Sequence, residues 1–217
     1  CRFLEKRIEY LGHIIDENGI TPGMQKVAAI KNFKIPTNTT EVRRFLGLTG
    51  FFRKFVPEYS LISKPITVLL TKSNQNKFIW GSEQQHSFET LIKALTNEPI
   101  LVLYDVNAQH EVHTDASSIG LAGVLLQSTD GSTWRPVCYY SRHCTNTESR
   151  YEVLAVVETL ERFRIYLLGT QLKIVTDFSA IAHVKEHKEL KSKIARWWLK
   201  LLEYNFVIVH RQGSRLQ

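Results

Sequence analysis

The residues of this sequence that could do chemistry are a few acidic ones at the ends of apolar stretches. Of the five aspartates, Asp16 and Asp130 lie in turn-forming segments and Asp105 lies in a connecting stretch. Asp115 and Asp177 differ, because each follows a threonine at the end of a short apolar run that is typical of a strand. A carboxylate at the end of a buried strand is costly unless something pairs with it. These two positions are therefore candidates for a functional site.

The two aspartates can meet if their strands lie side by side in one sheet. One strand opens the second half of the chain and the other follows a crossover helix, which permits neighbouring strands in a mixed sheet. Glu152 would lie in the first turn of that helix, where its side chain could reach the same edge. Three hard carboxylates, Asp115, Glu152 and Asp177, suit Mg²⁺ (or Mn²⁺), and two such ions could hydrolyse a phosphodiester. The alternative is that each aspartate caps a turn and that Glu152 only favours a helix start.

The elements that must position these residues fall into two regions. The predicted fold is α/β, with a hairpin at residues 1–20, a helical segment at 21–97, and a mixed five-stranded sheet with flanking helices at 108–217. In the last region the expected order is β-β-β-α-β-α-β. Its strands are expected at 111–116, 121–128, 134–141, 171–177 and 205–210, and its first helix at about 149–168.

Helix boundaries in the first region follow from capping residues and prolines. Pro22 is expected at the first position of a helix, because its missing N–H is not needed there. Asn38, followed three residues later by Glu41, resembles a capping box that opens a second helix. Pro57 and Pro65 are expected to divide the following stretch into short helices.

The 217-residue chain is basic, with 28 Lys and Arg against 21 Asp and Glu and a formal net charge of +7. The excess lies towards both ends, which suits a protein that binds a polyanion, although many basic domains bind no nucleic acid. No long apolar run or signal peptide is present, so no membrane span is expected. Three cysteines without metal-ligand spacing favour a reducing, intracellular compartment. The start at Cys1 indicates a piece of a longer chain.

Several motifs resemble those of gypsy-type LTR retrotransposon Pol polyproteins. Those in the first region are similar to the segment downstream of the reverse-transcriptase palm: Tyr10-Leu11-Gly12-His13, Asn18-Gly19-Ile20, Arg44-Phe45-Leu46-Gly47-Leu48 and Phe52-Arg53-Lys54-Phe55. Those in the second region are similar to a ribonuclease H domain: Thr114-Asp115-Ala116-Ser117, Tyr140-Ser141-Arg142, Leu154-Ala155-Val156-Val157, Thr176-Asp177 and Arg196-Trp197. The motifs occur in the family's order along the whole chain, which makes the resemblance specific.

The resemblance implies part of a reverse transcriptase/ribonuclease H. Residues 1–20 would end the polymerase palm, 21–97 would form the thumb and connecting segment, and 108–217 a C-terminally truncated ribonuclease H-like domain. Asp115, Glu152 and Asp177 match the family's metal-binding catalytic carboxylates, with two Mg²⁺ or Mn²⁺ ions. The implied partners are an RNA·DNA hybrid, whose RNA strand is hydrolysed, a primer-template duplex, and the rest of the Pol polyprotein. The implied location is a cytoplasmic particle or the nucleus.

The resemblance also implies residues that contact nucleic acid: Tyr10, Gly12, His13, Arg43, Arg44, Arg53 and Lys54. The basic ones would contact phosphates without reading sequence, and the alternative for each is a solvated helix face. A second functional possibility is a catalytically dead ribonuclease H-like connection module that only binds duplex. A third is a zinc peptidase, because His183-Val184-Lys185-Glu186-His187 matches a metalloprotease pattern.

Overall fold

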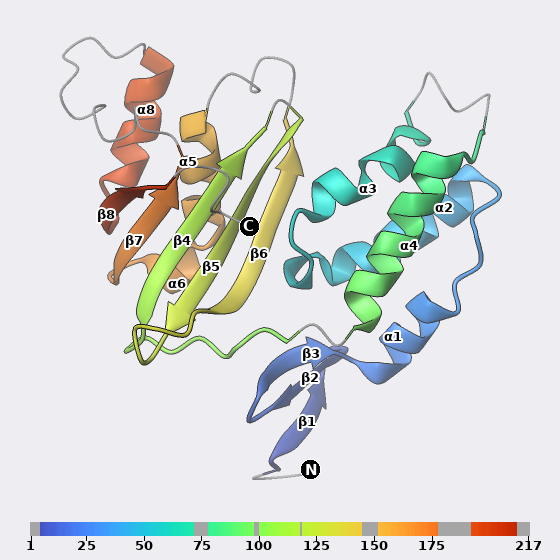
Figure 1. Cartoon of the computed structure of the whole chain (residues 1–217), viewed down its shortest axis with the longest axis horizontal. Coiled ribbons are helices and arrows are strands. Elements are labelled where there is room, and N and C mark those ends of the chain that lie inside the picture. Colours follow the sequence, from blue (N-terminus) through green and yellow to red (C-terminus); the bar gives the residue numbers. More distant parts are fainter. Residues whose placement is uncertain are drawn as a thin grey trace. The chain divides into compact units, whose positions relative to one another are not determined.

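The structure is a computed structural model that describes residues 5–71, 78–97, 100–117, 119–144, 152–177 and 192–211, without the side chains of 152 and 192–195. The chain divides into two compact units, Cys1–Leu103 and Tyr104–Gln217 (Figure 1). Each unit is described by itself below. No helix among the described residues is long and apolar enough to cross a membrane.

The first unit begins with a three-stranded antiparallel sheet in the order β1-β2-β3. Its strands are β1 (Arg7–Tyr10), β2 (His13–Asp16) and β3 (Gly19–Pro22). Leu11 and Gly12 both have positive φ, 48° and 76°, as the two-residue turn of a tight hairpin requires. The expectation that Pro22 opens a helix is wrong, because Pro22 pairs with His13 in β3. Proline is tolerated there since Pro22 is the last residue of β3, an edge strand of the sheet.

The helices of the first unit pack around phenylalanine side chains. They are α1 (Met24–Lys31), α2 (Thr39–Phe51), the 3₁₀ turn η1 (Arg53–Phe55), α3 (Tyr59–Val68) and α4 (Ser82–Thr96). The predicted cap of α2 is present, because the Asn38 side chain accepts a hydrogen bond from the Glu41 N–H at 3.0 Å. Pro65 does not end a helix as expected but lies inside α3. The Pro65 carbonyl accepts a hydrogen bond from Gln84 of α4 at 3.2 Å, which ties α3 to α4 at this point.

The described part of the second unit contains a five-stranded mixed sheet in the order β6-β5-β4-β7-β8. Its strands are β4 (Gln109–Ala116), β5 (Gly120–Ser128), β6 (Arg135–His143), β7 (Gln171–Thr176) and β8 (Asn205–His210). The β4–β5 and β5–β6 pairs are antiparallel, and the β4–β7 and β7–β8 pairs are parallel. The predicted α/β architecture with a mixed five-stranded sheet is therefore confirmed, and the strands follow one another along the chain as expected.

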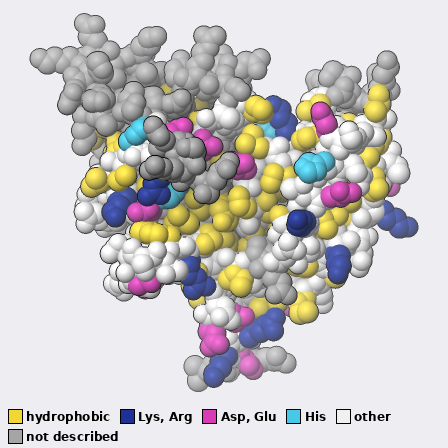
Figure 2. Space-filling model, viewed as in Figure 1, with side chains coloured by type: hydrophobic (Ala, Val, Ile, Leu, Met, Phe, Trp, Pro, Cys, Tyr) yellow, Lys and Arg dark blue, Asp and Glu magenta, His cyan; other side chains and the backbone are white. Residues whose placement is uncertain are grey.

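Among the described residues, the helices α5 (Glu152–Arg162), α6 (Arg164–Leu167) and α8 (Ser192–Leu201) lie behind the sheet in Figure 1. The single helix expected at about 149–168 is interrupted at Phe163, which separates α5 from α6. Leu121 of β5 packs with Leu154 and Ala155 of α5. Because strand residues alternate between faces, Ala122 lies on the opposite face. That face is turned to the viewer in Figures 1 and 2, and hydrophobic side chains are visible on it.

Candidate functional site

Asp115 and Asp177 occupy matching positions on two neighbouring parallel strands. The pairs of β4 with β7 run in register from His110 opposite Leu172 to His113 opposite Val175. The same register, continued for two residues, places Asp115 opposite Asp177. Both side chains are exposed. Since alternate residues share a face, they also lie on the same face of the sheet. Asp115 and Asp177 therefore both lie at the carboxyl ends of neighbouring parallel strands.

The third predicted carboxylate, Glu152, is the first residue of α5. Both β4 and β6 run antiparallel to β5, so the chain leaves β6 at the end of the sheet where β4 ends. Helix α5 therefore begins near the edge that carries Asp115 and Asp177, as Figure 1 shows. The Glu152 side chain lies outside the described residues. Among those that are described, no three His, Cys, Asp or Glu side chains form a group that could hold a metal.

The described donors at this edge fit a hard divalent cation by their chemistry. Asp115 and Asp177 supply carboxylate oxygens, which are the ligands that Mg²⁺ and Mn²⁺ prefer. Both are exposed, so an ion and a phosphate could approach them from solvent. The other aspartates are used locally. The Asp130 carboxylate accepts hydrogen bonds from the Ser132 and Thr133 N–H groups, and these bonds strongly lower its pKa.

The last strand fixes the backbone at Asp177, a feature that the sequence analysis missed. The His210 ring donates a hydrogen bond from Nε2 to the Asp177 carbonyl oxygen at 2.9 Å. The Arg211 N–H donates to the Thr176 carbonyl at 3.0 Å. These bonds extend the parallel pairing of β7 and β8 to the point where Asp177 begins. A histidine at the end of the last apolar run is the one sequence signal that could have indicated this contact.

Three of the residues predicted to contact nucleic acid, Tyr10, Gly12 and His13, lie at the tip of the β1–β2 hairpin. Tyr10 is 62% exposed at the end of β1. The His13 ring instead lies among three phenylalanines, with ring centroids 5.3, 5.5 and 5.7 Å from those of Phe51, Phe52 and Phe55. Its immediate role is therefore to pack the hairpin against the end of α2 and η1.

The turn that contains Gly12 and His13 is held by backbone contacts as well. Gly12 accepts a hydrogen bond from the Gly23 N–H at 2.8 Å, and His13 Nδ1 donates to the Leu11 carbonyl at 3.1 Å. Burial, and then the nearby positive charge of Lys54, lower the pKa of His13 below its usual value. The imidazole is thereby favoured in its neutral form inside the cluster.

The four predicted phosphate contacts lie on α2 and η1. Arg43 and Arg44 are exposed on α2. The Arg53 guanidinium lies 5.5 Å from the centroid of the Tyr59 ring, and Lys54 Nζ lies 5.3 Å from that of Phe55. The latter two cations thus sit beside the aromatic cluster that holds His13. Their contact with nucleic acid stays a prediction. The His183 to His187 motif lies outside the described residues.

The sequence is similar to a known domain family and to the polyproteins of two transposons. Residues 80–174 match the family model described as "RNase H-like domain found in reverse transcriptase". Over 99% of its length the chain is 38% identical to the retrovirus-related Pol polyprotein from transposon 297 of Drosophila melanogaster. It is 33% identical to the transposon Tf2-3 polyprotein of Schizosaccharomyces pombe, also over 99% of its length. The chain spans 20% and 17% of these two relatives.

Solved structures share the fold. The foamy viral protease-reverse transcriptase dRH in complex with double-stranded DNA superimposes with a TM-score of 0.79 and 23% identity, over 97% of this chain and 38% of that one. The foamy viral enzyme in complex with an RNA/DNA hybrid gives a TM-score of 0.75 and 22% identity, over 97% and 30%. At this identity the likeness shows the fold alone.

The mixed sheet with its helix layer is thus a ribonuclease H-like fold of the kind found beside reverse transcriptases. Over almost its whole length the chain is similar to a segment of retrotransposon Pol polyproteins, and residues 80–174 match the ribonuclease H-like domain that is found in reverse transcriptases. The resemblance drawn from the motifs is confirmed.

Proposed function

We propose that the second unit hydrolyses the RNA strand of an RNA·DNA hybrid, with Mg²⁺ or Mn²⁺ as cofactor. The observation that supports the proposal is the parallel register of β4 and β7, which runs to His113 opposite Val175 and, continued for two residues, would align Asp115 with Asp177. Asp115, Asp177 and Glu152 would hold the ions. When bound, two such ions activate a water molecule and stabilise the oxygen that leaves the phosphodiester.

In this proposal, the residues of the chain supply the negative charge that attracts the cations and hold the carboxylates in position. Two carboxylates side by side repel each other, and a divalent cation relieves that repulsion, so the arrangement favours cation binding. The hydrogen bond from His210 holds the Asp177 backbone while the side chain remains exposed to solvent. A hybrid would be distinguished from DNA by the 2′-hydroxyl groups of its RNA strand.

We also propose that the first unit binds the duplex as part of a larger Pol protein with a polymerase palm upstream. Two lines of support are the exposed arginines of α2 and the foamy viral proteins of similar fold, which were solved with double-stranded DNA and with a hybrid. Charge-neutralising substitution of Arg43 and Arg44 should weaken duplex binding and reduce its salt dependence by about one unit of slope per lost phosphate contact.

Cleavage of an end-labelled RNA·DNA hybrid by the 217-residue chain tests the nuclease function. The control for Asp115→Asn is Asp105→Asn, because Asp105 Oδ1 accepts a hydrogen bond from the Asn107 N–H and asparagine can accept the same bond. The parent and Asp105→Asn should cut in the presence of Mg²⁺ or Mn²⁺, and Asp115→Asn should bind the hybrid without cutting it. A parent that binds but does not cut would instead support the inactive connection module. Equal loss of binding and cutting in Asp115→Asn would contradict the assignment.

A further inference from the structure

We propose that Arg142 is a positioning residue of the nuclease site. Its ion pair with Glu158 restrains the rotation and the axial position of α5, and with them the position of Glu152 in the first turn of the helix. The inference rests on the proposed function, because it concerns the same site.

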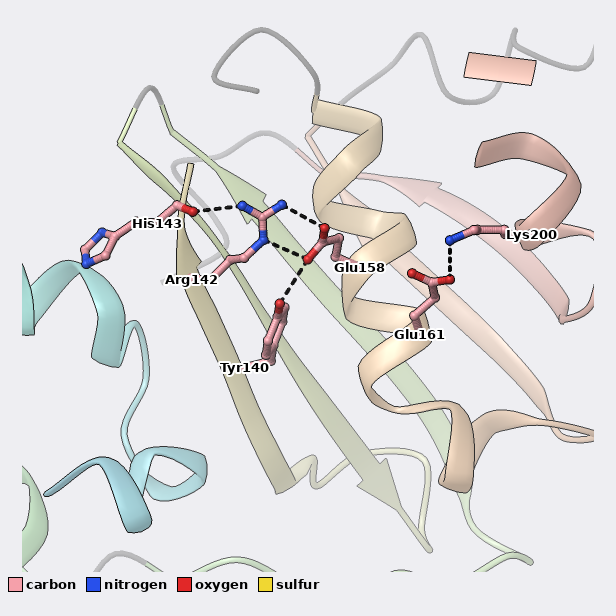
Figure 3. Close-up of polar contacts among 6 residues, drawn as sticks. All are labelled: Tyr140, Arg142, His143, Glu158, Glu161 and Lys200. Atoms are coloured by element: carbon pink, nitrogen blue, oxygen red, sulfur yellow. Dashed lines mark hydrogen bonds and ion pairs between the residues drawn. The ribbon is translucent and has the colours of Figure 1, made fainter. Parts of the chain in front are cut away.

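The contact between Arg142 and Glu158 joins β6 to the middle of α5 (Figure 3). Arg142 donates from Nε to Glu158 Oε2 and from Nη2 to Glu158 Oε1, both at 2.7 Å. The Tyr140 hydroxyl donates to the same Oε2 at 3.0 Å, and Arg142 Nη1 donates to the His143 carbonyl at 2.8 Å. Each side chain of the ion pair is only about a quarter exposed, 26% and 27%. A two-pronged, partly buried pair of this kind fixes orientation as well as distance.

The other anchors of α5 restrain it differently. Thr159 lies so close to Gly123 that a Cβ on Gly123 would be 2.4 Å from Thr159 Cγ2, which sets how near the helix lies to the sheet. Glu161 accepts a single hydrogen bond from Lys200 of α8, and these side chains are 43% and 49% exposed. One flexible, half-exposed ammonium contact restrains rotation weakly. Buried apolar side chains also hold α5 against the sheet, and the two-pronged pair of Arg142 with Glu158 adds a polar contact with β6 that restrains the rotation of the helix.

A small rotation of α5 would move the Glu152 side chain substantially. A side chain on a helix ends about 5–6 Å from the helix axis, so a rotation of about 20° displaces its end by about 2 Å. Misplacement by about 1 Å at a catalytic site can reduce the rate roughly 100-fold. Residues that orient metal ligands typically change metal affinity or activity by roughly 10–100-fold when substituted.

The test compares the full chain with Arg142→Gln and with Lys200→Gln, which removes the other ion pair of α5. Three quantities are measured: the Mn²⁺ dissociation constant by electron paramagnetic resonance, kcat and KM for hybrid cleavage, and the thermal unfolding midpoint. Well below that midpoint, Arg142→Gln should weaken Mn²⁺ binding and lower kcat by at least about tenfold, with KM for the hybrid within about threefold of the parent. Lys200→Gln should match the parent in all three. A loss of stability alone would lower the midpoint without changing Mn²⁺ affinity.

The outcomes separate this inference from the function on which it rests. If the parent binds Mn²⁺ and cuts, and Arg142→Gln does the same as Lys200→Gln, the positioning role is refuted and the nuclease function stands. If the parent neither binds Mn²⁺ nor cuts, the proposed function fails and the inference fails with it. If Arg142→Gln does not fold, Arg142→Lys carries the test. Arg142→Lys keeps the positive charge but loses the two-pronged contact with Glu158, so it should weaken Mn²⁺ binding less than Arg142→Gln does. If Arg142→Lys binds Mn²⁺ as tightly as the parent, the positioning role of Arg142 is refuted.

Discussion

The close approach of α5 to β5 predicts a large cost for a single added carbon atom at Gly123. In Gly123→Ala the new Cβ would lie 2.4 Å from Thr159 Cγ2, 2.5 Å from Thr159 Oγ1 and 3.0 Å from Thr159 Cβ. Thr159 is fully buried, and its branched side chain has few rotamers in a helix, so it cannot move aside freely. Overpacking of this kind lowers the free energy of unfolding by about 1–3 kcal/mol. For a unit of this size that is roughly 4–12 °C in the unfolding midpoint.

Scanning calorimetry of Gly123→Ala, Thr159→Ala and the double variant measures this effect. Thr159→Ala removes the two nearest atoms, so the double variant should recover about 1 kcal/mol or more of the sum of the single costs. The control is Gly47→Ala in α2, where an added Cβ meets no atom within 4 Å. That variant should be more stable than the parent by about 0.5–1 kcal/mol. A Gly123→Ala protein that unfolds at the parent's temperature, or strictly additive costs in the double variant, would refute the packing argument.

Three further predictions concern the first unit. Burial and the charge of Lys54 lower the pKa of His13 in the folded unit. As the pH falls from about 6.5, His13 is therefore protonated in the unfolded chain at a higher pH than in the folded unit. The unit should lose stability over that range, and His13→Phe should flatten the loss in unfolding curves recorded at several pH values. Asn38→Ala removes the cap of α2 and should cost about 1 kcal/mol in urea unfolding. Hydrogen bonds lower the pKa of Glu41, and the bond from the Thr37 N–H contributes most. The stabilisation that these bonds give to the folded unit should therefore be lost as the pH falls below about 4.5, and Glu41→Gln should not show this part of the pH dependence.

The second unit could be predicted well because its signals are local. Each strand is a short apolar run bounded by turn residues, and the run before Asp177 follows the first three runs through one amphipathic crossover helix. A crossover of that kind places two strands parallel in one sheet, so their adjacency followed from the order of the elements. The register that aligns the two aspartates could not be predicted, because it depends on hydrogen bonds between strands about sixty residues apart.

The features that were missed depend on contacts between distant residues. Pro22 carries the same local signal for a helix start as for the end of an edge strand, and pairing with β2 decided between them. The packing of His13 among phenylalanines joins a hairpin to a turn about forty residues later. The pair of Arg142 with Glu158 joins a strand to a helix sixteen residues later, at a place where α5 lies close to Gly123 of the sheet. None of these contacts has a spacing that can be recognised in the sequence.

The central claim is that Asp115 and Asp177 together form a cation site. Titration of Mn²⁺ into the parent chain, Asp115→Asn, Asp177→Asn and Asp105→Asn, followed by electron paramagnetic resonance, tests it most directly. The account predicts that the parent and Asp105→Asn bind Mn²⁺ alike, and that each of the other two variants binds it at least about tenfold more weakly. Equal Mn²⁺ affinity in all four proteins would contradict it.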